Sequence, residues 1–321
     1  MHHRLLLRRG AMPVPPPLPP RTPPPGVARP FASLPPPPPL QSRREVHVWY
    51  VCPDELNDHS HLDMYMELLS PSERKNALSM NGPRLQKDAM LSRALLRTTL
   101  SRCILDTNSK IDPRSFEFKK NKFGKPEILW RSDDSNMEWP WHFNISHTSS
   151  LIACGIAMDA PIGIDVEEKK RKTTKSILSL ARRYFTPSEV DSLAKIADSD
   201  AQQKEFIKLW TLKEAYVKAL GRGFSGAPFN RFSIQLKTNS RIQITKAPKV
   251  CNDSDSGDYL SENWRFALTE LNSSYYMAVC IEDNSRGSEN GSVPLGLKVW
   301  KTVPFIEDTL VSGTDAVKLI T

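Results

Sequence analysis

The segment Phe185-Thr186-Pro187-Ser188-Glu189 repeats the pattern of Leu69-Ser70-Pro71-Ser72-Glu73 at a distance of 116 residues. In each copy a hydroxyl residue, a proline and a glutamate suit the N-cap, the first and the third position of a helix. There the hydroxyl and the glutamate can bind free backbone N–H groups, and the proline sacrifices no hydrogen bond. Both segments therefore predict the start of a helix.

Strand-like segments precede both predicted helix starts, again 116 residues apart. Hydrophobic residues alternate from Val46 to Tyr50 and from Ile162 to Val166, as on half-buried strands. Longer helix patterns follow at Arg84–Leu100 and Lys204–Leu220. These lie 120 residues apart, which predicts a four-residue insertion between the helices of the second half. Three matches in one order indicate an internal duplication rather than a coincidence.

Each half thus reads as a strand, two helices and further strands. The later strands are expected at Lys125–Trp130, His142–Ala157, Arg231–Ile244, Trp264–Glu270 and Ser274–Ile281. The predicted fold class is α+β, with two similar α/β halves related by a pseudo-twofold axis and an active site in the cleft between them. The halves are placed at residues 45–160 and 161–285, and residues 286–321 remain as a C-terminal extension of unknown role.

Residues 1–44 form a leader of distinct composition. The chain of 321 residues has 44 Lys and Arg against 36 Asp and Glu, but the leader holds seven arginines and no acid, which leaves 37 bases against 36 acids. Fifteen of the 27 prolines lie between Pro13 and Pro39, which predicts an extended, disordered arm. Because the body is near neutral, we expect no nucleic-acid partner.

The leader also bears on the compartment. Its arginine-rich, acid-free composition resembles an organellar transit peptide, and we favour the mitochondrion over the plastid. The alternative is a cytosolic protein with a proline-rich tail that serves as an SH3-type ligand. The five cysteines are widely spaced, which favours a reducing compartment. No apolar run approaches the roughly 20 residues of a membrane span.

The segment Gly163-Ile164-Asp165-Val166-Glu167 is the first candidate for chemistry. On a strand, side chains alternate between faces, so Asp165 and Glu167 share one face. Mg²⁺ takes such oxygen ligands and completes its coordination with substrate phosphates. The alternative is a strand with a solvated acidic face.

The segment Lys208–Gly223, KLWTLKEAYVKALGRG, is the second candidate. Helical spacing places Glu214 and Lys218 four residues apart on one face, and Gly221 suits the end of the helix. A Glu–Lys pair at this spacing is otherwise an ordinary surface salt bridge.

Two further segments are rich in hydrogen-bond donors. Four lysines surround the turn Gly124-Lys125-Pro126, where they could bind phosphate groups or simply be solvated. The strand end Phe143-Asn144-Ile145-Ser146-His147 carries polar side chains, although a single histidine is more often a local hydrogen-bonding group than a catalyst.

In sequence order these segments resemble the Sfp-type 4′-phosphopantetheinyl transferases, a family of holo-acyl-carrier-protein synthases. The matching motifs are GKP at Gly124–Pro126, FNISH at Phe143–His147, GIDVE at Gly163–Glu167 and WTLKEAYVKALGRG at Trp210–Gly223. The resemblance covers roughly Glu45 to Ile281 and leaves out the leader and the last 40 residues. The duplicated architecture is also the architecture of this family.

The resemblance implies that the chain moves 4′-phosphopantetheine from coenzyme A to a serine of an apo acyl or peptidyl carrier protein and releases adenosine 3′,5′-bisphosphate. Asp165, Glu167 and Glu214 would hold Mg²⁺ in the second half. Glu214 would also be the base for the carrier serine, and Lys218 would neutralise charge on the leaving phosphate.

The resemblance also implies a set of residues that cradle the coenzyme A nucleotide: Arg93, Lys120, Lys125, Asn144, Ile145, Ser146, His147 and Lys218. Arg93 stands opposite Lys213 at the distance of 120 residues, so the two long helices would face a shared cleft.

The expected partner is an acidic carrier protein. The basic stretch Lys169–Lys175, with Arg182, Arg183, Arg222 and Phe224, could receive it, or could be a solvated helix face. A monomer is expected because one duplicated chain supplies both sides of the cleft. Two other functions remain open: an inactive coenzyme A or nucleotide-binding module, and a scaffold that recruits partners through its proline-rich arm.

Overall fold

The computed structural model describes residues 34–106, 109–129, 140–171, 173, 175–236, 242–246, 264–283 and 295–320. Most of the leader, Trp130, Lys172, Cys251 and residues 286–294 of the C-terminal extension lie outside these residues. In the described part of the chain, no helix combines the length and the apolar character needed to cross a membrane.

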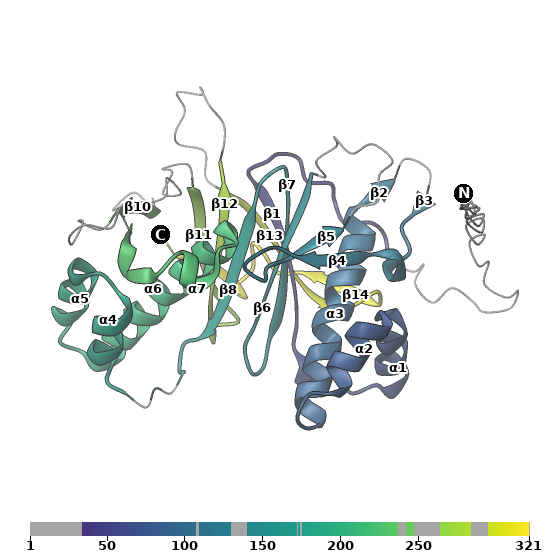
Figure 1. Ribbon diagram of the computed structural model, residues 1–321, viewed down its shortest axis with the longest axis horizontal. Coiled ribbons are helices and arrows are strands. Elements are labelled where there is room, and N and C mark those ends of the chain that lie inside the picture. The colour runs from purple at the N-terminus through teal and green to yellow at the C-terminus, as the bar shows by residue number, and fades with distance from the viewer. Residues whose placement is uncertain are drawn as a thin grey trace, which may run out of the picture.

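In the described part of the first half, three α-helices lie on one side of the strands (Figure 1). In chain order its principal elements are β1 (Glu45–Val51), α1 (His59–Leu68), α2 (Pro71–Leu78), α3 (Pro83–Cys103), β4 (Glu117–Lys120), β5 (Pro126–Leu129), β6 (Trp141–His147) and β7 (Ile152–Met158). Two-residue strands β2 (Leu105–Asp106) and β3 (Ser109–Lys110) pair with each other.

The second half repeats this order. Its elements are β8 (Ile162–Glu168), α4 (Ile177–Tyr184), α5 (Pro187–Ala194), α6 (Ser199–Leu220), α7 (Gly223–Gly226), β9 (Phe232–Leu236), β10 (Ile242–Lys246), β11 (Trp264–Leu271) and β12 (Tyr275–Glu282). The pairing repeats as well, because β1–β7–β6 in one sheet corresponds to β8–β12–β11 in the other, all antiparallel. The predicted α+β class with two similar halves is confirmed.

The two sheets form the inner layers of the molecule and the helices form the outer layers (Figure 1). Alternate residues of β1 and β8, including Val48 and Ile164, pack between the sheets, and their neighbours face the helices. One further core lies under α1–α3 and another under α4–α6. Strands β1 and β8 are therefore buried on both faces.

Both predicted helix starts are present as capping boxes. The Ser70 hydroxyl accepts from Glu73 N and the Glu73 carboxylate accepts from Ser70 N, and Thr186 and Glu189 do the same. The predicted four-residue insertion is wrong: α3 starts at Pro83 and α6 at Ser199, still 116 residues apart. Because one helical turn is 3.6 residues, a shift of four residues keeps the same hydrophobic face, and the sequence pattern could not distinguish the two alignments.

This correction changes which residues correspond. Lys213 is matched by Arg97, 116 residues earlier, and not by Arg93. In the first half the positions of Asp165, Glu214 and Lys218 are occupied by Trp49, Thr98 and Arg102. That half therefore lacks the carboxylates of the second.

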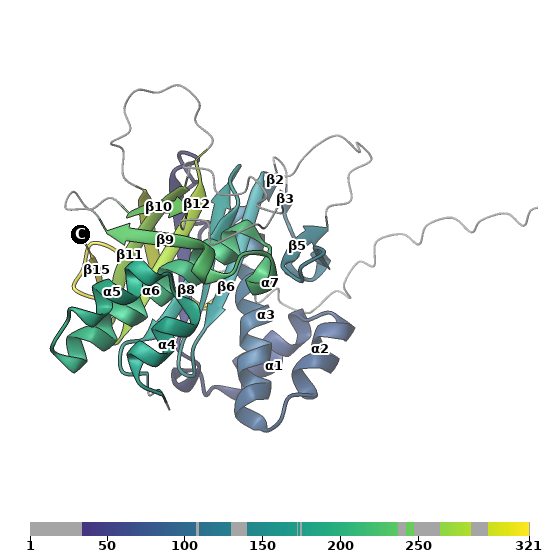
Figure 2. The ribbon, with the colours of Figure 1, turned by 60° about the vertical axis from the view of Figure 1, so that its left-hand side comes forward.

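The C-terminal extension contributes strands to both sheets. β13 (Gly296–Val303) pairs parallel with β1 and antiparallel with β14 (Glu307–Leu310), while β15 (Val317–Leu319) pairs with β11. Figure 2 shows β15 and the C-terminus beside the strands of the second half. The Trp49 and Trp300 rings stack with their centroids 4.6 Å apart. The extension thus completes the first sheet and extends the second.

The end of the leader lies against the body. The Leu40 side chain is buried, Arg43 pairs with Asp159 at 3.3 Å, and Arg44 pairs with Asp283 at 3.2 Å. The part of the predicted arm that precedes residue 34 lies outside the described residues.

Candidate active site

The polar residues of β8 meet α6 because of Gly163. A Cβ atom on Gly163 would lie 1.9 Å from Ala215 O and 2.4 Å from Ala219 N, so only glycine lets the helix backbone approach the strand this closely. The corresponding position of β1 is His47. The glycine of the GIDVE motif therefore sets the distance between the strand that carries Asp165 and the helix that carries Glu214.

Asp165 and Lys218 form the centre of the site. The Lys218 Nζ lies 2.6 Å from Asp165 Oδ1 and 3.1 Å from Ser146 Oγ, and it also donates to Ile164 O at 3.2 Å. Ser146 Oγ donates to Asp165 Oδ1 at 3.0 Å. Asp165 is 4% exposed. Residues from β6, β8 and α6 thus converge on one buried carboxylate.

Glu214 and Glu167 add two half-buried carboxylates. Burial, followed by the charge of Asp165, raises the pKa of Glu214 to about 7. The same two causes raise the pKa of Glu167, whose carboxylate also pairs with Arg171 at 2.7 Å. The charge of Asp165 thus disfavours ionisation of both glutamates, and the charge of Glu167 also raises the pKa of Glu214.

The three carboxylates are a possible donor set for a divalent cation. In the described part of the chain, no three His, Cys, Asp or Glu side chains already form a metal-binding group. However, Asp165 Oδ2 is buried and has no hydrogen-bond partner, and burial together with the charge of Asp165 raises the pKa of both glutamates. Mg²⁺ prefers oxygen ligands such as carboxylates, so Asp165, Glu167 and Glu214 fit the ion.

The FNISH strand joins the two halves. Asn144 Oδ1 accepts from Ile164 N at 3.0 Å, and Ser146 Oγ accepts from Val166 N at 3.1 Å. These buried side chains thus connect β6 to β8. Ile145 packs against the core of the first half, whereas His147 is exposed at the end of β6. Of this strand, His147 is the side chain most available to a ligand.

The GKP turn connects the halves at a second place. Lys125 Nζ donates to Ile162 O at 3.0 Å and to Ala219 O at 3.3 Å, and burial lowers its pKa to about 8. Asn121 Nδ2 donates to Gly221 O at 3.0 Å. The turn therefore holds the C-terminal end of α6. Sequence reasoning assigned no role to Asn121, and nothing local distinguishes it, because its partner is 100 residues away.

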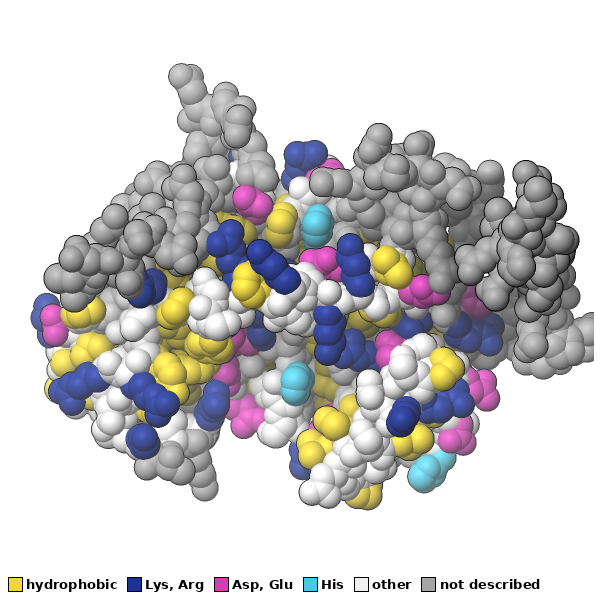
Figure 3. Space-filling view, viewed as in Figure 1, with side chains coloured by type: hydrophobic (Ala, Val, Ile, Leu, Met, Phe, Trp, Pro, Cys, Tyr) yellow, Lys and Arg dark blue, Asp and Glu magenta, His cyan; other side chains and the backbone are white. Residues whose placement is uncertain are grey.

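The remaining predicted residues lie outside this centre. Arg93 is half-buried on α3 and makes no hydrogen bond or ion pair with the described residues. Lys120 is exposed at the end of β4. In the space-filling view, Lys and Arg side chains gather across the middle of one face, where the β4–β5 hairpin lies, and a hollow opens between the two helical lobes (Figure 3).

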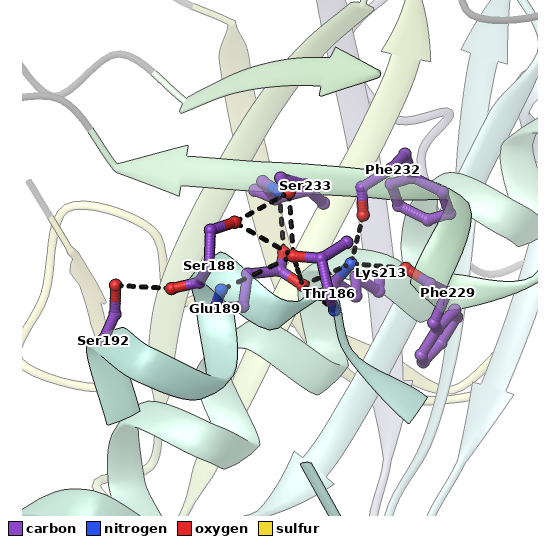
Figure 4. A network of polar contacts seen from close by, with 9 residues as sticks. Thr186, Ser188, Glu189, Ser192, Lys213, Phe229, Phe232 and Ser233 are labelled. Carbon is purple, nitrogen blue, oxygen red and sulfur yellow. Dashed lines mark hydrogen bonds and ion pairs between the residues drawn. The ribbon is translucent and has the colours of Figure 1, made fainter. Parts of the chain in front are cut away.

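A buried ion pair beside the site was also missed. Lys213 immediately precedes Glu214 in the sequence, and its Nζ lies 2.9 Å from Glu189 Oε2 (Figure 4). The capping-box pattern at Thr186–Glu189 predicted the local role of Glu189, but not its pairing with α6. Only the packing of α5 against α6 brings these charges together.

Comparisons with known proteins address the family. The model described as "4'-phosphopantetheinyl transferase superfamily" matches residues 161–280, and "4'-phosphopantetheinyl transferase, N-terminal" matches residues 57–157. The chain is 33% identical over 220 residues to the 4′-phosphopantetheinyl transferase Sfp of Bacillus subtilis, covering 68% of this chain and 84% of that protein. It is 31% identical over 204 residues to the 4′-phosphopantetheinyl transferase HetI of Nostoc, covering 64% and 79%.

Among solved structures, the holo-[acyl-carrier-protein] synthase of Thermotoga maritima aligns with a TM-score of 0.27 at 22% identity, covering 40% of this chain and 70% of that one. This score is too low to add to the fold assignment. The two matched models share a boundary near residue 160, where β7 of the first half ends and β8 of the second begins. The motifs, the site and these matches agree, and the chain belongs to the 4′-phosphopantetheinyl transferase superfamily as an enzyme of that class.

Proposed function

We propose that this transferase takes phosphopantetheine from coenzyme A, attaches it to a serine of an apo acyl or peptidyl carrier protein, releases adenosine 3′,5′-bisphosphate, and requires Mg²⁺. The observation that supports this proposal is the convergence of Asp165, Glu214 and Lys218 from β8 and α6 beside the junction of the halves. Phosphoryl transfer depends mainly on positioning and on stabilisation of negative charge, and these residues supply both.

Asp165, Glu167 and Glu214 would hold the cation. When bound, Mg²⁺ would neutralise the pyrophosphate of coenzyme A and charge that develops on it. The free oxygen of Asp165 is the strongest support for this assignment, because a buried carboxylate oxygen normally has a partner.

Glu214 is the proposed base for the carrier serine. A pKa of about 7 makes its carboxylate able to take up a proton at neutral pH, unlike an ordinary glutamate. Lys218, one turn further along α6, would place its ammonium group against the phosphate that leaves. Asp165 and Ser146 hold that ammonium group in place.

His147, Arg93 and Lys120 are the proposed contacts to the nucleotide of coenzyme A. His147 is exposed, Lys120 is exposed, and Arg93 has no partner among the described residues, so all three can bind phosphate without breaking an existing contact. Lys125, Asn144 and Ser146 would act mainly by holding the halves together, since their polar groups are already bonded across the junction.

Intact-mass spectrometry of an apo carrier protein tests the reaction. With coenzyme A and Mg²⁺ the carrier should gain one phosphopantetheine, and Glu214→Gln should reduce the rate at least about 100-fold. Glu205→Gln is the matched control, because Glu205 lies on the same helix in a partly exposed pair with Lys208. Full activity of Glu214→Gln would remove the assigned base. Coenzyme A binding without transfer to any carrier would favour the inactive binding module.

Proton release tests the metal site without turnover. Because the pKa of Glu214 is about 7, roughly half of this carboxyl is protonated at pH 7, and Mg²⁺ binding should displace about half a proton per chain. The release should fall toward zero at pH 9, where Glu214 is already ionised. Calorimetry in buffers of different ionisation enthalpy measures it, with Glu214→Gln as the control. Release unchanged in that variant would assign the protons elsewhere.

The carrier, the compartment and the oligomeric state belong to the same proposal. We place an acidic carrier on the basic residues Arg182 and Arg183 with the exposed Phe224, and reversal of both charges should raise the KM for the carrier.

Deletion of residues 2–33 from a full-length fluorescent fusion should abolish organellar import, with the mitochondrion favoured. Light scattering should give the mass of a monomer. Import and turnover that survive the deletion would reject the targeting role while leaving the enzyme assignment intact, and loss of partners alone would favour the scaffold.

A further inference from the structure

Lys213 is a charged side chain placed where no water reaches it. Its side chain is 0% exposed, and its Nζ has three acceptors: Glu189 Oε2 at 2.9 Å, Phe229 O at 2.8 Å and Phe232 O at 2.5 Å (Figure 4). The Phe232 ring lies 4.3 Å from the same nitrogen. A buried ammonium group is tolerated only when its hydrogen bonds are satisfied, so these contacts leave it a single position.

Glu189, the partner of Lys213, is itself fixed by hydrogen bonds to both of its carboxylate oxygens. Its Oε2 accepts from Thr186 N at 3.0 Å and from the Thr186 hydroxyl at 2.9 Å, and its Oε1 accepts from Ile234 N at 2.9 Å. The Thr186 and Ser233 hydroxyls lie 2.8 Å apart. The network therefore fixes α6 simultaneously to the start of α5 and to β9.

The network and the active site lie on different sides of the same helix turn. Consecutive residues of a helix point about 100° apart. Lys213 points to α5 and β9, whereas Lys218 reaches Asp165 on β8. A rotation or slide of α6 that preserved the packing of its apolar residues would break the Lys213 contacts. The ion pair thus sets the rotation of the helix that carries Glu214 and Lys218.

The first half contains a corresponding ion pair, Arg97–Glu73, but no carboxylate at the position that matches Glu214. Arg97, at the position that matches Lys213, pairs with the capping-box residue Glu73 at 2.7 Å, donates to Pro113 O at 2.8 Å and lies 5.3 Å from the Phe118 ring. The next residue is Thr98, which donates to Leu95 O. This pair supplies a control within the chain: the Arg97 side chain is buried like that of Lys213, Glu73 is partly exposed, and the pair adjoins none of the carboxylates of the candidate site.

We propose that Lys213 is a positioning residue of the transferase: its buried contact with Glu189 sets the placement of Glu214 and Lys218 against Asp165. The inference rests on the proposed roles of Glu214 and Lys218. Lys213 touches neither substrate nor metal in this account. It acts through the orientation of α6, and the corresponding Arg97–Glu73 pair contributes to stability alone.

The test compares Lys213→Met with Arg97→Met in the full chain. Both variants should lower the melting temperature, because Lys213→Met leaves the buried Glu189 and Arg97→Met the partly exposed Glu73 without its cation. Only Lys213→Met should reduce kcat, by about 10- to 100-fold, since small displacements of catalytic groups cost that much. The KM values for coenzyme A and the carrier should stay within about threefold of wild type. Rates are measured well below both melting temperatures.

Two further variants separate position from stability. Lys213→Arg, which copies the first half, should restore much of kcat. Lys213→Met/Glu189→Gln removes both charges, so it should regain melting temperature over the single variant while kcat stays low. The proposal is overturned if kcat recovers together with melting temperature in that double variant, or if Arg97→Met loses as much kcat as Lys213→Met.

A metal titration distinguishes this proposal from the proposed function. Mg²⁺ affinity measured by calorimetry should weaken in Lys213→Met and remain unchanged in Arg97→Met. If wild type binds Mg²⁺ but transfers nothing, the proposed function fails and this comparison still decides the inference. If wild type neither binds the ion nor turns over, both are rejected. Equal affinity in wild type and Lys213→Met would reject the positioning role.

Discussion

At the scale of single residues, the candidate active site depends on Gly163, which has no side chain. Gly163 allows α6 to contact β8, and without that contact Lys218 could not reach Asp165 at 2.6 Å. The asymmetry between the halves has the same origin. His47 stands at the corresponding position of β1, and the positions that match Asp165 and Glu214 carry Trp49 and Thr98. A duplicated fold thus retains one site.

Gly163→Ala should destabilise the protein and abolish transfer. The added Cβ meets backbone atoms of Ala215 and Ala219, which cannot move aside as a side chain can, so we expect a loss of about 3 kcal/mol or more in the free energy of unfolding. Urea denaturation measures it. Gly155→Ala is the control, because its Cβ first meets the flexible end of Ile162 at 3.0 Å and should cost less. Equal losses in the two variants would contradict this account.

At the scale of secondary-structure elements, the two capping boxes share one sequence motif but differ in burial and in the contacts that they make with other elements. The Ser70 box is partly exposed and Ser70 bonds within its own turn, although Glu73 also binds Arg97. The Thr186 box is buried and its hydroxyl also contacts Ser233 of β9. The first starts a helix, and the second in addition joins three elements around α6.

Replacement of each cap by alanine should reveal this difference. Ser70→Ala should cost about 1 kcal/mol in the free energy of unfolding, the usual value for an N-cap. Thr186→Ala should cost about 2 to 3 kcal/mol, because it also leaves buried partners unsatisfied. Chemical denaturation monitored by circular dichroism compares them. Costs that agree within experimental error would mean that the link from Thr186 to β9 contributes nothing.

At the scale of the whole molecule, the C-terminal extension is part of the framework. Lys298 of β13 pairs with Glu45 of β1 at 2.7 Å, and Asp308 accepts hydrogen bonds from both Trp49 and Arg102. Arg102 occupies the position that matches Lys218. The extension therefore supplies a carboxylate to the first half where the second half has Asp165.

Acid should weaken this attachment. Burial alone would raise the pKa of Glu45, but hydrogen bonds from Lys298, Gln41 and His47 outweigh it and lower the pKa from 4.5 to about 2. A carboxylate with a lowered pKa stabilises the folded state above about pH 4.5, and the stabilisation is lost as the pH falls toward 2, since the unfolded chain takes up the proton first.

Glu45→Gln provides the measurement. It should cost about 3 kcal/mol of unfolding free energy at pH 6, and the difference from wild type should shrink by about half by pH 3. Glu307→Gln, at an exposed position of β14, is the control for the general effect of removing an acid. A difference between Glu45→Gln and wild type that is independent of pH from 3 to 6 would contradict the assigned role of Glu45.

The sequence alone predicted much of the fold and the family of this protein. The alternation at Ile162–Val166, the capping boxes and the motif order determined the strands, the helix starts, the duplication and the family, because each of these is encoded within a few neighbouring residues. Helical spacing likewise placed Glu214 and Lys218 on one face of α6.

Only the tertiary structure decided what those elements do to one another. The alignment of the long helices was wrong by one turn, because an amphipathic helix looks nearly the same after four residues. Lys125 donates to the carbonyls of Ile162 and Ala219, a contact that the sequence did not predict, and its contact with a phosphate stays a prediction. Lys213 pairs with Glu189, and the C-terminal strands join both sheets. These contacts connect residues far apart in the chain, and a local pattern carries no information about which distant group will satisfy a buried charge.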